Sequence, residues 1–142
     1  THNNIIGLII LFSFLLIRKY SGGYHCKSST VCLIFSIIVL IAMVFYANLM
    51  NFSPVIIITI ILCELELIIK GPIISINHDI SDKERIIYRK YLYIILAVYD
   101  IIMALFIYFN KIHLACSIAI VIITCSLAHM ICMIGKNKEV YY

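Results

Sequence analysis

Composition places this chain in a lipid bilayer. Its 142 residues are 64% hydrophobic and only 13% charged, and the mean hydropathy of +1.11 lies far outside the range of soluble domains. The apolar residues form runs near the length that crosses about 30 Å of hydrocarbon. We therefore predict one membrane-embedded domain over residues 1–142, folded as an all-α polytopic bundle. The net charge of +4 does not indicate nucleic acid as a partner, because the basic residues sit in short loops between apolar runs.

Five apolar runs predict five membrane segments. They cover residues 5–17, 31–50, 54–69, 91–109 and 113–134. The first run is short for a span and the chain starts at Thr1, so we expect preceding sequence and a sixth segment in the full-length protein. Residues 51–53 make a tight turn, in which Ser53 can cap the next helix and Pro54 suits its first position. Residues 71–90 are expected to form the only long polar loop.

The basic residues predict which ends of the segments face the cytoplasm. Ten of the eleven Lys and Arg residues lie in the first loop, in or beside the third loop, or in the tail. These three regions alternate to one side of the membrane, and the other side holds only Lys111. By the positive-inside rule the basic side is cytoplasmic. We predict a multi-pass protein of the cell membrane with residues 18–32 at the cytoplasmic face.

Residues 18–32, RKYSGGYHCKSSTVC, place a histidine and two cysteines in the first polar break. Cys32 follows His25 by seven residues, which on one continuous helix would separate them by about 10.5 Å. If they act together the chain must fold back between them, and the adjacent glycines and hydroxyl residues permit a turn and a helix cap. With Ser29 as cap, Cys32 is the third residue of the second segment, where the helix dipole favours a thiolate. His25 could then be the general base, and backbone N–H groups of that turn could hold an oxyanion.

Other interpretations of this segment stay open on spacing alone. His25 can be a solvated interfacial residue, and Cys32 can be a packing residue in a helix with no chemical role. Cys26 is a competing nucleophile, although it adjoins His25 and has no helix terminus to lower its pKa. These three residues could also bind a metal, but no paired C-x-x-C motif supports a metal site. We predict neither a metal nor a cofactor.

The segment resembles the signature of the accessory gene regulator protein B (AgrB) family, which are membrane cysteine endopeptidases that process quorum-sensing pro-peptides in Gram-positive bacteria. The family pattern has basic residues, a Gly-x-His and a Cys seven residues after that His. Here these are Arg18-Lys19, the Gly-Tyr-His that ends at His25, and Cys32. Residues 71–90 resemble the family's later cytoplasmic loop, except that His78-Asp79 stands where members more often carry a basic residue and Pro. The likeness covers nearly the whole chain.

The resemblance implies His25 and Cys32 as the catalytic pair and an AgrD-like pro-peptide as the substrate. Such a peptide has an amphipathic leader, a short signal segment with an internal Cys or Ser, and an acidic tail. Cleavage by Cys32 would release the tail, and the peptide's own thiol or hydroxyl would capture the acyl-enzyme as a thiolactone or lactone. Four basic residues are expected to attract the acidic tail: Lys83, Arg85, Arg89 and Lys90. The sequence leaves open whether two copies of the chain form a homodimer.

Three carboxylates lie inside the apolar runs, where ionisable groups are costly and often functional. Glu66 can pair with Lys70 across one helical turn. Glu64 and Asp100 lack an obvious local partner, and each is a candidate for orienting His25, as a third group does in many nucleophile–base systems.

A different class of function remains as the alternative. A small multi-helix transporter could use Glu64, Glu66 or Asp100 as a proton-coupled or cation site. A non-catalytic membrane scaffold is a third hypothesis. The remaining intramembrane histidines, His113 and His129, are expected to be packed or interfacial.

Overall fold

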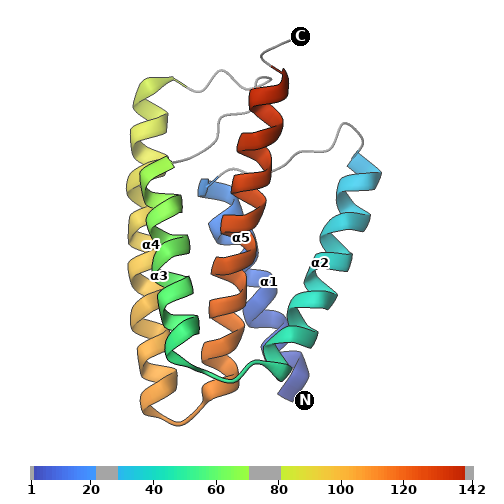
Figure 1. Ribbon diagram of the computed structural model, residues 1–142, viewed down its shortest axis with the longest axis vertical. Coiled ribbons are helices and arrows are strands. Elements are labelled where there is room, and N and C mark those ends of the chain that lie inside the picture. The colour runs from blue at the N-terminus through green and yellow to red at the C-terminus, as the bar shows by residue number, and fades with distance from the viewer. Residues whose placement is uncertain (1, 22–28, 71–80, 140–142) are drawn as a thin grey trace.

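In the part of the chain that the structure describes, five helices run up and down along a common direction (Figure 1). The computed structural model describes residues 2–21, 29–70 and 81–139, with side chains at 4–20, 30, 31, 33–70 and 81–134. The helices are α1 (His2–Ser21), α2 (Ser29–Leu49), α3 (Pro54–Lys70), α4 (Asp82–Tyr108) and α5 (Ile112–Glu139). The predicted all-α class is confirmed, and the five helices follow the order of the five apolar runs.

Two of the helices meet the length and composition of a membrane span within the described residues. They are the whole of α4 and residues Ile112–Ile134 of α5, and Leu33–Leu49 of α2 is a shorter apolar helix. Five membrane-spanning segments therefore stay a prediction. The apolar side chains on the outside of the bundle agree with a lipid environment. On α2, for example, the side chains of Ile38, Ile41 and Phe45 are each more than half exposed.

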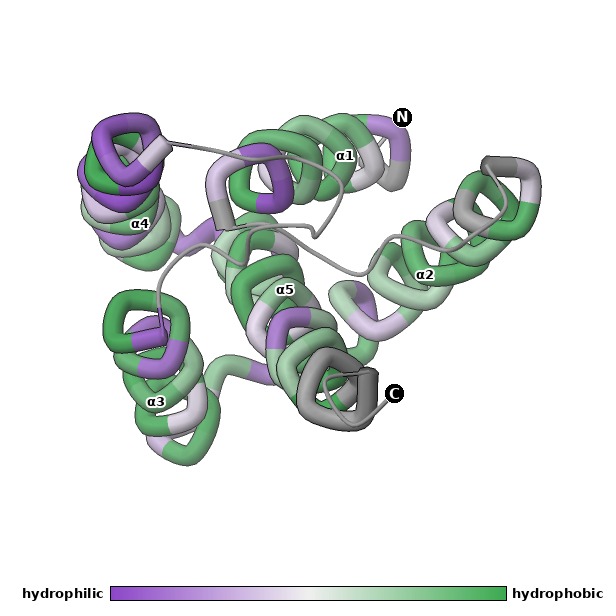
Figure 2. Tube along the Cα trace, turned by 90° about the horizontal axis from the view of Figure 1, so that it is seen from above, coloured by the Kyte–Doolittle hydropathy of each residue, from purple (hydrophilic) through white to green (hydrophobic). Residues whose placement is uncertain are grey.

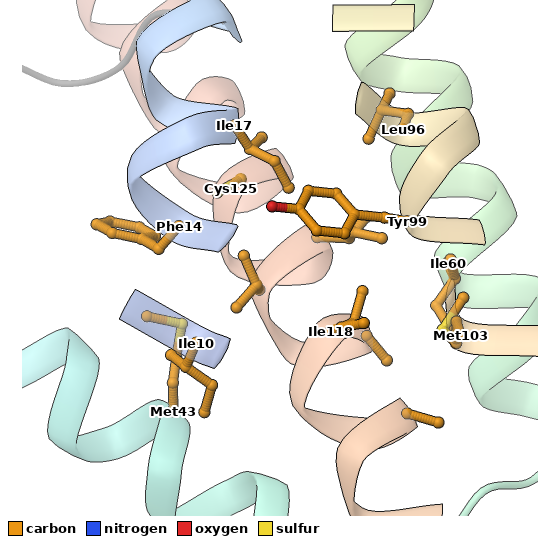
Figure 3. Packing of buried hydrophobic residues seen from close by; sticks show 14 of the residues in the cluster. Ile10, Phe14, Ile17, Met43, Ile60, Leu96, Tyr99, Met103, Ile118 and Cys125 are labelled. Atoms are coloured by element: carbon orange, nitrogen blue, oxygen red, sulfur yellow. The ribbon is translucent and has the colours of Figure 1, made fainter. Parts of the chain in front are cut away.

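Helix α5 occupies the centre of the bundle and packs against each of the other four helices (Figure 2). Small residues on α5 make this possible, because they let neighbouring backbones approach closely. Ala115, Ser117 and Ala119 are all 0% exposed. Around α5, the side chain of Tyr99 on α4 reaches across to α1 and lies near Ile17 and Cys125 (Figure 3). The core thus joins α1, α4 and α5 in one apolar cluster.

Helix α4 corrects one expectation about the third loop. Residues 82–90 are helical, whereas we expected residues 71–90 to form a polar loop and the next segment to start at 91. The physical reason is a capping box at the start of the helix. The Ser81 hydroxyl accepts a hydrogen bond from the Glu84 backbone N–H at 3.4 Å, and the Glu84 carboxylate accepts one from the Ser81 N–H at 3.2 Å. Residues 71–80 lie outside the described residues.

The other helices also extend past their apolar runs. α1 includes Arg18 and Lys19 in its last turn, where cations complement the negative end of the helix dipole. Pro54 is the first residue of α3, as expected. At the turn between α4 and α5, Asn110 has φ 60°, a left-handed conformation that Asn tolerates better than most residues.

One end of the bundle gathers the three predicted basic regions. α1, α3 and α5 end there, and α2 and α4 begin there (Figure 1). We call this the basic end, defined by Ser21, Ser29, Lys70, Asp82 and Glu139. Lys111 lies at the opposite end, in the turn between α4 and α5. The alternation from which the orientation was predicted is therefore present, and the assignment of the basic end to the cytoplasm stays a prediction.

Candidate functional site

Cys32 lies in the first turn of α2, at the basic end. The helix begins at Ser29, so Cys32 is its fourth residue rather than the third residue after a serine cap. His25 and Cys26 lie outside the described residues, as does the side chain of Cys32. The distance between the predicted base and nucleophile is therefore untested, and the pair stays a prediction.

The end of α1 is fastened to its neighbours just before the segment that carries His25. Tyr20 stacks on Tyr91 of α4 with ring centroids 5.4 Å apart and meets Tyr88 at 5.8 Å. The Lys19 ammonium lies 5.4 Å from the centre of the Tyr20 ring. Aromatic pairs at these separations each contribute roughly 0.5–1.5 kcal/mol beyond the area they bury. The position of Ser21, where α1 ends, is thus set by packing on α4.

A hydrogen bond joins α1 to α2 one turn further into the bundle. The Arg18 guanidinium donates to the Ser36 hydroxyl at 3.1 Å, and the same guanidinium lies 5.6 Å from the centre of the Phe14 ring. Ser36 follows Cys32 by four residues, which is about 6 Å along α2. The two helices that flank residues 22–28 are therefore held together close to the basic end.

Glu66 of α3 is the centre of a polar network inside the bundle. One carboxylate oxygen lies 2.8 Å from Nδ1 of His129, and the other accepts a hydrogen bond from the Ser126 hydroxyl at 2.9 Å. His129 is 0% exposed, Ser126 is 1% exposed, and the Glu66 side chain is 12% exposed. The predicted pairing with Lys70 is confirmed, with an N···O distance of 3.7 Å. Glu66 thereby links α3 to α5 through two buried groups.

His129 was expected to be packed, and it is, but its partner was missed in the sequence. The signal available in the sequence was the depth of the two residues in their apolar runs: Glu66 lies three residues before the end of the run 54–69, and His129 lies five residues before the end of the run 113–134. An acid and a histidine at similar depth on two apolar helices can cancel each other's burial cost.

Glu64 and Asp100, the candidate orienting acids, interact with each other. The Asp100 carboxyl on α4 acts electrostatically on that of Glu64 on α3. One oxygen of Glu64 is buried with no hydrogen-bond partner among the described residues. Because His25 lies outside those residues, the orienting role of either acid stays a prediction.

The four basic residues expected to bind substrate do not share one face of α4. Arg89 reaches α3: its guanidinium donates to the backbone oxygens of Ile68 at 3.1 Å and Ile69 at 3.3 Å. It also donates to the Tyr93 hydroxyl at 2.9 Å, and that hydroxyl lies 3.4 Å from the Ile68 oxygen. Helix C-termini leave backbone oxygens without intrahelical partners, so Arg89 and Tyr93 cap the end of α3.

The other three basic residues lie on two different faces of α4. Taking the buried Leu92 and Leu96 as the inner face of α4, the 100° step per residue puts Arg85 on that inner face, seven residues before Leu92. The same step puts Lys83 and Lys90 on the opposite face. All three are exposed. The two lysines lie on the outer face, and Arg85 lies one turn before Arg89, which already reaches the last turn of α3.

Comparison with known proteins decides the family. The profile described as Accessory gene regulator B matches residues 1–133 of this chain. The chain belongs to the accessory gene regulator B family. AgrB proteins are membrane-bound components of the accessory gene regulator system of quorum sensing, and the resemblance noted at residues 18–32 and 71–90 is therefore confirmed.

A curated relative gives the same family. AgrB-like protein 2 of Clostridium perfringens is 44% identical over 61 residues, which cover 39% of this chain and 28% of the relative. The matched region thus spans less than a third of that relative's length. No solved structure matches the chain.

Proposed function

We propose that this AgrB-family chain is a membrane cysteine endopeptidase that cleaves the C-terminal tail from an AgrD-like pro-peptide. One observation carries the proposal: a chain of this family has the Gly-x-His and Cys signature, with Cys32 in the first turn of a helix. A thiol at a helix N-terminus meets the positive end of the dipole, which favours the thiolate that attacks carbonyl groups.

The proposed chemistry divides the roles between two side chains. His25 accepts the Cys32 proton, and the thiolate attacks the carbonyl carbon at the end of the signal segment. The tetrahedral oxyanion faces backbone N–H groups of the first turn of α2, which have no intrahelical acceptor. The protonated His25 then gives its proton to the amine of the tail, which leaves, and the signal segment stays on Cys32 as a thioester.

The thioester is resolved within the peptide. The internal Cys or Ser of the signal segment gives its proton to His25 and attacks the thioester carbonyl. Cys32 leaves as a thiolate, and a thiolactone or lactone ring closes. Holding the two groups on one bound chain gives the internal nucleophile a high effective concentration over water. The ring closure exchanges one thioester for another, or for an ester, so the acyl group needs no further activation.

Arg85 is the basic residue on α4 that best suits an acidic tail. It lies on the inner face, one turn beyond Arg89, which already caps α3. A cation at that position attracts an acidic segment toward the basic end, where Cys32 lies. We place this end at the cytoplasmic face by the positive-inside rule, and Glu64 or Asp100 remains the candidate for orienting His25.

Single-residue variants test the nucleophile. Cys32→Ala should abolish cleavage of a co-expressed pro-peptide while the amount of protein in the membrane is unchanged, and Cys26→Ala should keep most of the activity. The assay is the appearance of the released tail by mass spectrometry. Loss of cleavage in Cys26→Ala with retention in Cys32→Ala would assign the nucleophile to the other cysteine.

A further inference from the structure

Helix α4 carries an unbroken apolar stripe opposite its packed face. Leu92, Leu96 and Met103 are buried against the bundle. On the opposite side, spaced by three, four or seven residues, the stripe contains exposed side chains that lie one above another. It consists of Ile87 at 50%, Ile94 at 49%, Ile101 at 63% and Leu105 at 49% exposure. Among the described residues no other element covers this stripe.

Two lysines belong to the same stripe at its basic end. Lys83 precedes Ile87 by four residues, and Lys90 follows it by three, so all three side chains share one face of α4. Both lysines are exposed. No acidic residue occupies this face: Asp82, Glu84 and Asp100 each lie about 85° to 115° from its centre by the 100° step.

The length of α4 places these lysines at the surface of the bilayer. The helix has 27 residues, which is about 40 Å at 1.5 Å per residue. The hydrocarbon layer takes about 30 Å, or about 20 residues counted back from Tyr108. Lys90 then stands at the edge of the hydrocarbon, and Lys83, about 10 Å further out, stands among or just beyond the headgroups.

We propose that Lys83 and Lys90 bind the headgroup of an anionic phospholipid whose acyl chains lie along Ile94, Ile101 and Leu105. The basic ends of the side chains supply the charge that attracts a phosphate, and the apolar stripe that continues from them suits an acyl chain. A water-soluble acidic peptide would contact the two lysines but not the apolar side chains that continue from Lys90 into the hydrocarbon. The continuity of the charged and apolar parts therefore favours a lipid.

This inference separates the basic residues of α4 by partner. Arg85 and Arg89 face the bundle, where one is proposed to meet substrate and the other caps α3. Lys83 and Lys90 face away from it, toward lipid. The inference does not depend on the proposed peptidase activity, because lipid binding can be measured on protein that cleaves nothing.

Photo-crosslinking tests the site directly. The purified chain is placed in nanodiscs that contain phosphatidylglycerol with a photoactivatable acyl chain, and labelled peptides are mapped by mass spectrometry. A parallel sample contains phosphatidylcholine with the same chain. We expect the phosphatidylglycerol to label residues 94–105 more strongly. Each of Lys83→Gln and Lys90→Gln should reduce that label roughly fivefold, since a juxtamembrane cation contributes about 1 kcal/mol.

Matched variants decide between the partners. Lys111→Gln removes a cation at the opposite end of the bundle, and Arg85→Gln removes one on the inner face. Both should leave the label on residues 94–105 unchanged, and Lys83→Arg with Lys90→Arg should keep it. Equal labelling by the two lipids, equal loss in Arg85→Gln, or competition by an acidic peptide that displaces the label would each overturn the inference.

Discussion

The Glu66 network offers a quantitative test of what holds α3 to α5. His129 is fully buried at 2.8 Å from the carboxylate, Ser126 is buried at 2.9 Å, and Lys70 lies at 3.7 Å with a side chain that is 42% exposed. Removing one partner of a buried hydrogen bond leaves the other partner unsatisfied, which costs about 1–3 kcal/mol for each neutral group. An exposed pair four residues apart contributes about 0.3–0.5 kcal/mol. Distance and burial therefore rank the three partners.

We expect Glu66→Leu to lower the free energy of unfolding by about 3 kcal/mol, because it leaves the Nδ1 atom of His129 and the Ser126 hydroxyl without their acceptor. In a double-mutant cycle, the coupling of Glu66 with His129 should be about 1.5 kcal/mol, near the upper end for polar pairs in membrane proteins. The coupling with Ser126 should be about 1 kcal/mol, and that with Lys70 below about 0.5 kcal/mol.

Reversible unfolding in mixed micelles measures these couplings. Far-UV circular dichroism suits the chain, which is helical and contains no Trp. The variants are Glu66→Leu, His129→Leu, Ser126→Ala, Lys70→Met and the three doubles. A coupling of Glu66 with Lys70 as large as that with His129 would refute the reasoning, because it would mean that the exposed cation, not the buried imidazole, holds the carboxylate. A His129 coupling near zero would do the same.

Three further predictions concern the basic end. Arg89→Gln should destabilise the protein by about 1–2 kcal/mol in the same unfolding assay, because the two backbone oxygens at the end of α3 lose their charged donor; Arg85→Gln, which removes an exposed side chain, should stay within about 0.5 kcal/mol. Ser81→Ala should cost about 1 kcal/mol and fray the first turns of α4 in hydrogen exchange, since it removes the capping box; exchange unchanged from the parent protein would argue against the cap. Tyr20→Leu should lower the turnover number of pro-peptide cleavage more than it changes the Michaelis constant, because the packing of the Tyr20 ring on Tyr88 and Tyr91 positions the end of α1. Tyr20→Phe keeps the ring and should keep both constants. An equal loss of turnover in the two variants would assign the effect to the hydroxyl instead.

The sequence predicted the helices well and their ends less well. Apolar runs locate the parts of the helices that need lipid or core, because burial of apolar surface dominates there. They say nothing of polar turns that stay helical for local reasons. The start of α4 is an example: Ser81 and Glu84 match the capping-box pattern in the sequence, whereas the polar composition of residues 82–90 predicts a loop.

The polar contacts of the bundle show the limit of sequence reasoning differently. The pairing of Glu66 with Lys70 was predictable, because residues four apart on a helix are neighbours. Its pairing with His129 joins residues 63 positions apart, and only the packing of α3 on α5 brings them together. The same holds for Arg89, because its contact with the end of α3 depends on the axial position of α4 relative to α3.

The division of charges on α4 follows from that packing and changes how the basic cluster is interpreted. In the sequence, Lys83, Arg85, Arg89 and Lys90 form one cluster with a common role, because composition does not record direction. On the helix, the two arginines face the bundle and the two lysines face away from it. A guanidinium can bridge two backbone oxygens with its planar array of donors, as Arg89 does. A lysine has a flexible chain that extends along apolar surface to a headgroup. The type of basic residue on each face thus agrees with the partner proposed for it, so that exchanging Arg89 for Lys should weaken the α3 cap while exchanging Lys83 or Lys90 for Arg should preserve lipid binding.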